Sequence, residues 1–113
     1  MDFKVDKTDK YTTIKMQAEK LDSNISPALK SELVVLNADG VKNIIIDLSE
    51  TRYCDSSGLS AILVANRLCK NSEGLFVLTG LQESVKKLIS ISQLDSILTI
   101  TNTFPEAAKI VTV

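Results

Sequence analysis

The chain has 113 residues, of which 44% are apolar and 24% are charged. This length suits one compact domain, 1–113, and the apolar fraction is too high for a disordered chain. The 13 Lys and Arg residues nearly balance the 14 Asp and Glu residues, and the formal net charge is −1. No basic surface therefore indicates binding to nucleic acid or to an anionic membrane. The absence of histidine excludes a Ser-His-Asp triad, a Cys-His dyad and a histidine metal ligand.

The two cysteines, Cys54 and Cys69, are too far apart for a CxxC motif, and without histidine they make a poor zinc site. Their apolar neighbours predict buried thiols in a reducing compartment. The first residues lack the basic start and apolar segment of a signal peptide. No apolar run approaches the roughly 20 residues that a membrane span needs. We therefore expect a cytoplasmic protein with no cofactor, no metal and no membrane contact.

The first third of the chain predicts a hairpin and a helix. Residues 3–6 and 11–18 are expected to form two strands, the second with alternating polar and apolar residues, joined by a polar turn. They would pair antiparallel near one edge of a sheet. Ser26 is a candidate N-cap and Pro27 suits the first helical position. The helix would bury Leu29, Leu33 and Leu36 and end at Asp39-Gly40.

The rest of the chain alternates strands with helices. Residues 43–48 include a continuous β-branched run, which is typical of a strand buried on both faces of a sheet. A polar loop follows over 49–57. The remaining expected elements are a helix over 58–70, a strand over 74–79, a helix over 82–93 with Val85, Leu88, Ile89 and Ile91 inward, a strand over 97–100 and a helix over 104–113. This order predicts an α/β fold, with a mixed, mostly parallel sheet of about five strands and about four helices.

The segment Asp55-Ser56-Ser57-Gly58 lies between the most buried strand and the second helix. Open α/β sheets place functional groups at the carboxyl ends of their strands, and this loop is predicted to lie there. A purely structural interpretation is also open. Asp55 or Ser56 would cap the helix, and Gly58 would leave its backbone uncrowded.

Together with Ile44-Ile45-Ile46-Asp47-Leu48 before it and Leu59 after it, this tetrad resembles the signature of the STAS domain, specifically of the anti-sigma factor antagonist family. Further segments agree with that family in order and spacing, namely Leu21-Asp22, Gly74-Leu75-Phe76-Val77-Leu78, Val85-Lys86-Lys87-Leu88-Ile89 and Leu94-Asp95. The sequence departs from the family at Tyr53-Cys54, where members often carry aliphatic residues.

The resemblance implies a regulatory switch and no enzymatic activity. The second serine of the tetrad, Ser57, would be phosphorylated by a partner that is both an anti-sigma factor and a serine kinase. The unphosphorylated form would bind that partner and free the sigma factor, and a metal-dependent serine phosphatase would restore the serine.

The second helix carries two apolar stripes. We expect Leu59, Ile62 and Leu63 to pack on the sheet, with Cys69 on the same face. The second stripe, with Ala61, Val64, Ala65 and Leu68, is either buried by neighbouring helices or exposed to a partner. In the second case the partner-binding residues are Asp55, Ser56, Ser57, Gly58, Ala61, Val64 and Leu68.

Several alternatives stay open. The domain could be a STAS scaffold without a switch, in a stress-signalling complex or beside a transporter. An enzyme with Ser57 as nucleophile would lack an evident base. Asp47 and Asp55 could form a carboxylate pair, although strand-end and capping roles explain both. Tyr53 could stack on a partner or anchor its own loop. The edge strand over 3–6 would permit self-association, but no sequence feature demands it, and the oligomeric state stays open.

Overall fold

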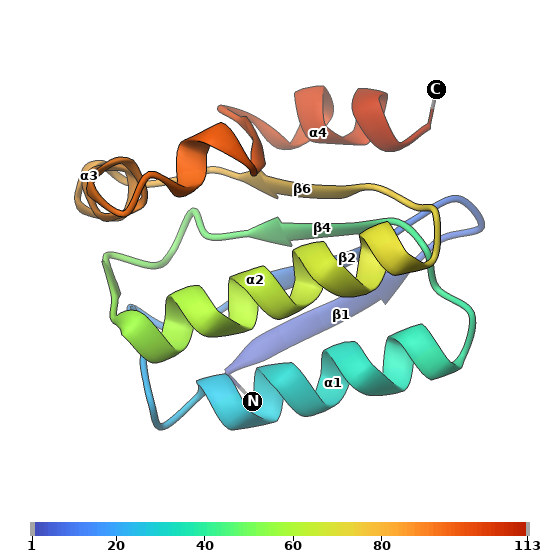
Figure 1. Cartoon of the computed structure of the whole chain (residues 1–113), viewed down its shortest axis with the longest axis horizontal. Coiled ribbons are helices and arrows are strands. Elements are labelled where there is room, and N and C mark those ends of the chain that lie inside the picture. The colour runs from blue at the N-terminus through green and yellow to red at the C-terminus, as the bar shows by residue number, and fades with distance from the viewer. Residues whose placement is uncertain (1, 113) are drawn as a thin grey trace.

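The computed structural model describes residues 2–112. Its main sheet has five strands in the order β1-β2-β4-β6-β7 (Figure 1). These strands are β1 (Phe3–Lys7), β2 (Thr12–Met16), β4 (Ile44–Asp47), β6 (Phe76–Thr79) and β7 (Thr99–Thr101). β1 runs antiparallel to β2, and all other neighbours are parallel. The predicted α/β class, the mixed sheet and the edge hairpin are thus confirmed.

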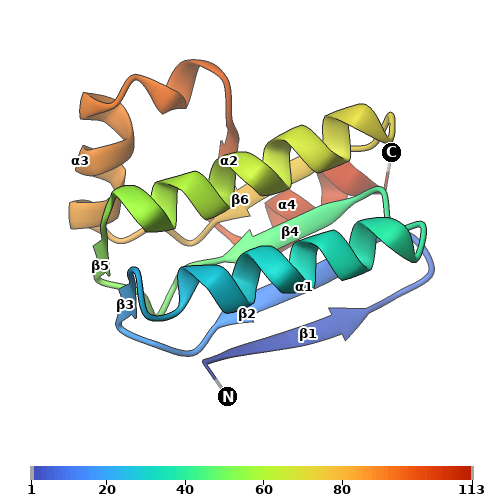
Figure 2. The same ribbon diagram turned by 60° about the horizontal axis from the view of Figure 1, so that its bottom comes forward.

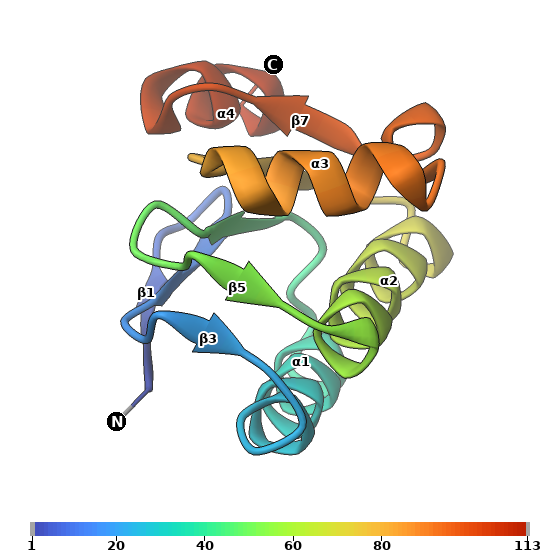
Figure 3. The same ribbon diagram turned by 90° about the vertical axis from the view of Figure 1, so that its left-hand side faces the viewer.

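Helices cover both faces of this sheet. α1 (Ser26–Ala38) and α2 (Ser56–Asn71) lie on one face, and α4 (Phe104–Val111) packs on the other against β4, β6 and β7 (Figures 1 and 2). α3 (Glu83–Ile91) and a short 3-10 turn, η1 (Leu94–Ser96), lie at one end of the sheet (Figures 1 and 3). Within residues 2–112, no helix has the length and apolar content to cross a bilayer.

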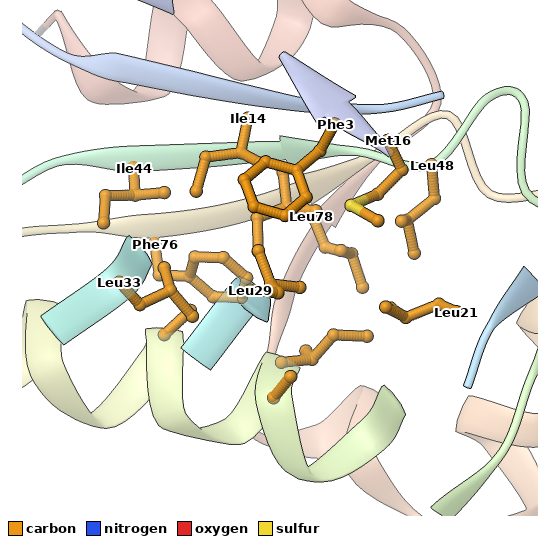
Figure 4. Packing of buried hydrophobic residues seen from close by; sticks show 14 of the residues in the cluster. Phe3, Ile14, Met16, Leu21, Leu29, Leu33, Ile44, Leu48, Phe76 and Leu78 are labelled. Atoms are coloured by element: carbon orange, nitrogen blue, oxygen red, sulfur yellow. The ribbon is translucent and has the colours of Figure 1, made fainter. Parts of the chain in front are cut away.

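β4 divides the core into two parts, as the β-branched run predicts. Ile44 and Ile46 are buried in the larger cluster beneath α1 and α2, and Ile45 is buried in the smaller cluster beneath α4. Alternate side chains of a strand point to opposite faces, so a strand covered on both sides needs apolar residues at successive positions. Figure 4 shows the larger cluster, where side chains of the sheet meet Leu29 and Leu33 of α1.

A second, two-stranded sheet was not predicted. β3 (Lys20–Leu21) pairs in parallel with β5 (Tyr53–Cys54), which lies inside the stretch expected to be a loop. Figure 3 shows the two strands side by side next to the start of α2. Two-residue strands are too short to display an alternating pattern. Their pairing depends on two segments that are more than thirty residues apart in the sequence.

Three local expectations were wrong. Ser26 is buried within the first turn of α1, where its Oγ donates to the Asp22 carbonyl, and Ile25 occupies the cap position. α2 begins at Ser56 rather than at Gly58, because Asp55 caps it. Ile91 is 79% exposed because α3 ends there. The last position of the expected fourth helix, 113, lies outside the described residues.

Candidate functional site

The Asp55-Ser56-Ser57-Gly58 segment forms the first turn of α2 and the residue that caps it. Asp55 is extended and directly follows β5, and Ser56, Ser57 and Gly58 are the first three helical residues. The β3-β5 pair supports this junction, because the backbone N–H of Asp55 donates to the Leu21 carbonyl. The tetrad thus lies between a strand and the second helix as predicted, but the strand directly before it is β5 of the small sheet and not β4.

The Asp55 carboxylate holds the turn together through a single oxygen. Asp55 Oδ1 accepts a hydrogen bond from Ser57 Oγ at 2.6 Å and another from the Gly58 backbone N–H at 3.0 Å. Both donors favour the ionised carboxylate and lower the pKa of Asp55, with the Ser57 hydroxyl as the larger cause. Asp55 is thus an anionic cap at the positive end of the helix.

The four residues of the tetrad differ in their exposure to solvent. Ser56 is exposed, Asp55 and Ser57 are half-buried, and Gly58 is buried. A Cβ added at Gly58 would lie only 2.6 Å from Cys54 Sγ and would also collide with the Leu21 carbonyl oxygen. Glycine therefore lets α2 start in direct contact with both strands of the small sheet, and this contact fixes the position of the Ser57 hydroxyl.

This arrangement gives the Ser57 hydroxyl no strong base. Ser57 is half-buried, and its hydroxyl proton is directed at the Asp55 carboxylate. An ionised Asp55 with a lowered pKa is a weak base, and the sequence offers no histidine to replace it. Within residues 2–112, no group of three or more Cys, Asp and Glu side chains is placed to hold a metal ion.

The two stripes of α2 are divided differently from the prediction. The buried face consists of Gly58, Ala61, Ile62, Ala65 and Cys69. Leu59 and Leu63, expected on the sheet, are half-buried, as are Val64 and Leu68. Ala61 has no exposed surface and therefore does not belong to a docking surface. The small alanines face inward because α2 packs against both β6 and α1, and close packing on two sides favours short side chains.

A half-buried flank of α2 continues from Ser57. Ser57, Val64 and Leu68 occur at helical spacing, so they lie along one side of the helix. All three are half-buried, between the core face and the solvent face. This flank, together with the half-buried Asp55 and the exposed Ser56, is what remains of the predicted partner-binding set once Ala61 and the buried Gly58 are removed.

The remaining candidates fill structural roles. Asp47 Oδ1 accepts the backbone N–H of Ser49 at 2.9 Å, which is a strand-end turn. Cys54 and Cys69 are buried as expected, and burial raises the pKa of their thiols to about 12 and about 11. Tyr53 on β5 is 52% exposed and is no half-buried anchor.

Comparison with known proteins identifies the fold and its relatives. A family model described as the STAS domain matches residues 2–107. An anti-sigma-B factor antagonist from Listeria monocytogenes is 31% identical over 85 residues, which cover 75% of each chain. The relative is a regulatory protein and not an enzyme.

Two solved structures show the same architecture. A candidate anti-sigma factor antagonist from Thermotoga maritima superposes with a TM-score of 0.87 at 25% identity, covering 98% of this chain and 95% of the other. The Bacillus cell fate determinant SpoIIAA in its phosphorylated form gives a TM-score of 0.76 at 22% identity, covering 96% and 98%. The match over residues 2–107 and the shared architecture place this chain in the STAS domain family.

Proposed function

We propose that this chain is an anti-sigma factor antagonist that Ser57 phosphorylation switches off. The unphosphorylated form binds an anti-sigma factor that is also a serine kinase, and phosphorylation of Ser57 releases it. A serine phosphatase returns the chain to its binding form. The observation that carries this proposal is the half-buried Ser57 in the first turn of α2, with its hydroxyl held by the Asp55 carboxylate. The Listeria relative, named an anti-sigma-B factor antagonist, supports the class of partner.

A phosphate on Ser57 changes the local electrostatics more than the fold. It adds about −1.5 to −2 charges to a chain whose formal net charge is −1. The ester removes the proton that Ser57 donates to Asp55 and sets a second anion beside the first. The Gly58 N–H continues to hold Asp55, and the positive end of α2 favours the added charge.

The same charge opposes a docked partner. A protein packed over the start of α2 must strip water from a phosphate that carries up to two charges and lies beside an ionised carboxylate. A loss of about 3 kcal/mol weakens affinity more than about a hundredfold. Release therefore requires no rearrangement of the core.

The docking surface proposed here consists of Asp55, Ser56, Ser57, Val64 and Leu68. Leu68→Glu places a charge on this flank, where it would weaken partner binding. Lys70→Glu is a matched control, because Lys70 is exposed on another side of the same helix. Both variants should remain folded by circular dichroism. Equal binding by the two variants would place the docking surface elsewhere.

The switch is tested by incubating the purified chain with ATP and the serine-kinase anti-sigma factors of its own cell. Intact mass should show the addition of one phosphate to the native chain and to Ser56→Ala, and none to Ser57→Ala. Ser57→Asp should lose partner binding in titration calorimetry, whereas Ser57→Ala should retain it. Phosphate on the Ser57→Ala chain, or tight binding by Ser57→Asp, would contradict the proposal.

A further inference from the structure

β1 is an open edge of the main sheet. The strand order begins at β1, and among residues 2–112 only β2 pairs with it. Figure 2 shows β1 running along the border of the sheet below α1. An edge strand presents unpaired backbone N–H and C=O groups that another strand can use.

The hydrogen bonds to β2 determine which residues of β1 point outward. The Gln17 N–H donates to the Asp2 carbonyl, and the Thr8 N–H donates to the Tyr11 carbonyl. Residues of an antiparallel pair alternate between bonded and non-bonded positions. The even-numbered residues of β1 therefore bond to β2, and the backbone groups of Phe3, Val5 and Lys7 face away from the sheet.

The charges on this strand complement a second copy in one register. We propose that two chains associate through antiparallel pairing of their β1 strands about a two-fold axis at Val5. In this register Val5 lies opposite Val5, and Phe3 lies opposite Lys7, so the outward backbone groups bond to each other. Lys4 of each copy then lies opposite Asp6 of the other, at the non-bonded positions where facing side chains are closest.

Neighbouring registers are unfavourable. Residues whose backbone groups face away from β2 must lie opposite one another, because only these groups are free to bond across the contact. The partner strand can therefore shift only by two residues at a time. One such step sets Lys4 against Lys4 and Asp2 against Asp6, and the other sets Asp6 against Asp6. Like charges directly opposite each other destabilise a strand pair. Charged residues on an edge strand usually prevent pairing, whereas this pattern favours the register centred on Val5 over both of its neighbours.

The surroundings of β1 suit such a contact. Val5 is half-buried and packs against the main core. Lys7 Nζ lies 4.0 Å from Asp39 Oδ2. Because Asp39 is the C-cap residue of α1, the C-terminal end of this helix lies beside β1. Val35, one helical turn earlier, is 53% exposed. Pairing of β1 would therefore bring apolar side chains together at Val5 and bring the two exposed Val35 side chains nearer to each other.

This association leaves the proposed phosphorylation site open. Figure 3 shows β1 and the start of α2 on opposite sides of the β3-β5 pair. A dimer through β1 would join two sheets into one continuous sheet and present two Ser57 sites. The inference depends only on β1, so its test does not depend on whether Ser57 is a phosphorylation site.

The test uses charge exchange at two exposed positions, Lys4 and Asp6. Lys4→Asp sets aspartates against Asp6, and Asp6→Lys sets lysines against Lys4, so either variant alone should self-associate at least about tenfold more weakly than the native chain. An equimolar mixture of the two variants forms two Asp-Lys pairs and should associate as the native chain does. Sedimentation velocity over a concentration series measures all four samples, and circular dichroism checks that each is folded.

The outcomes separate clearly. Dimers of the native chain, weaker association of each variant alone and recovery in the mixture establish the register. Amide exchange of Val5 should then slow with protein concentration. A native chain that stays monomeric up to the sub-millimolar range, or single variants that associate as well as the native chain, overturns the proposal. Failure of the mixture to recover association overturns it as well.

Discussion

Replacing Gly58 by alanine tests whether α2 is held directly against the small sheet. At an unobstructed helix position, alanine is about 1 kcal/mol more favourable than glycine. At Gly58 the new Cβ would lie 2.6 Å from Cys54 Sγ and would collide with the Leu21 carbonyl oxygen. The collision involves backbone, which cannot turn aside as a side-chain end can.

Overpacking of this kind costs about 1–3 kcal/mol, and two collisions, one of them with backbone, place Gly58→Ala in the upper part of that range. The alanine gain of about 1 kcal/mol offsets only part of this cost. We therefore expect Gly58→Ala to lower the free energy of unfolding by about 1–2 kcal/mol. The same substitution at an unobstructed helix position would raise it. In a domain of about this size, each kcal/mol corresponds to roughly 4–8 °C in Tm. Ser60→Ala, in the same helix, should leave Tm nearly unchanged.

Thermal and urea unfolding followed by circular dichroism measure this difference. The slope with urea should match that of the native chain, because the change does not alter the surface exposed on unfolding. A Gly58→Ala chain with a Tm equal to or above the native value would show that β3 and β5 shift at little cost to make room for the added Cβ. The account of how Ser57 is positioned would then be wrong.

Three further predictions concern single groups. Cys54 and Cys69 should react with a thiol reagent at pH 8 only after urea unfolding, because burial raises their pKa. The lowered pKa of Asp55 stabilises the fold above the ordinary carboxyl pKa of about 3.9. The advantage of the native chain over Asp55→Asn in urea should therefore shrink only as pH falls below about 4. Thr103→Ala removes the capping box of α4 and should lower the free energy of unfolding by about 1 kcal/mol.

The sequence predicted the structure best where a feature depends on residues that are close together in the chain. The run Ile44-Ile45-Ile46 predicted a strand covered on both faces, and each of these residues is buried. Asp55 was one of two capping candidates, and it accepts the Gly58 N–H as expected. Such features depend on neighbouring residues, whose spacing the sequence displays.

The predictions failed where contacts between segments that are distant in the sequence determine the structure. α2 is apolar on most sides, so its periodicity does not distinguish the face with Ala61 and Ala65 from the face with Leu59 and Leu63. Packing against α1 and β6 selects the shorter side chains for the crowded side. In the same way, β3 and β5 exist only because two distant segments meet.

Asp55 connects the structural interpretation of the tetrad with the functional one. The same oxygen that caps α2 also accepts the Ser57 hydroxyl, so capping and switching are not competing explanations. Phosphorylation of Ser57 would remove one of these two donors and leave the backbone donor in place. The helix would keep its cap, and the added charge would act on whatever covers the first turn. A switch built in this way can act on a partner while the domain that carries it keeps its fold.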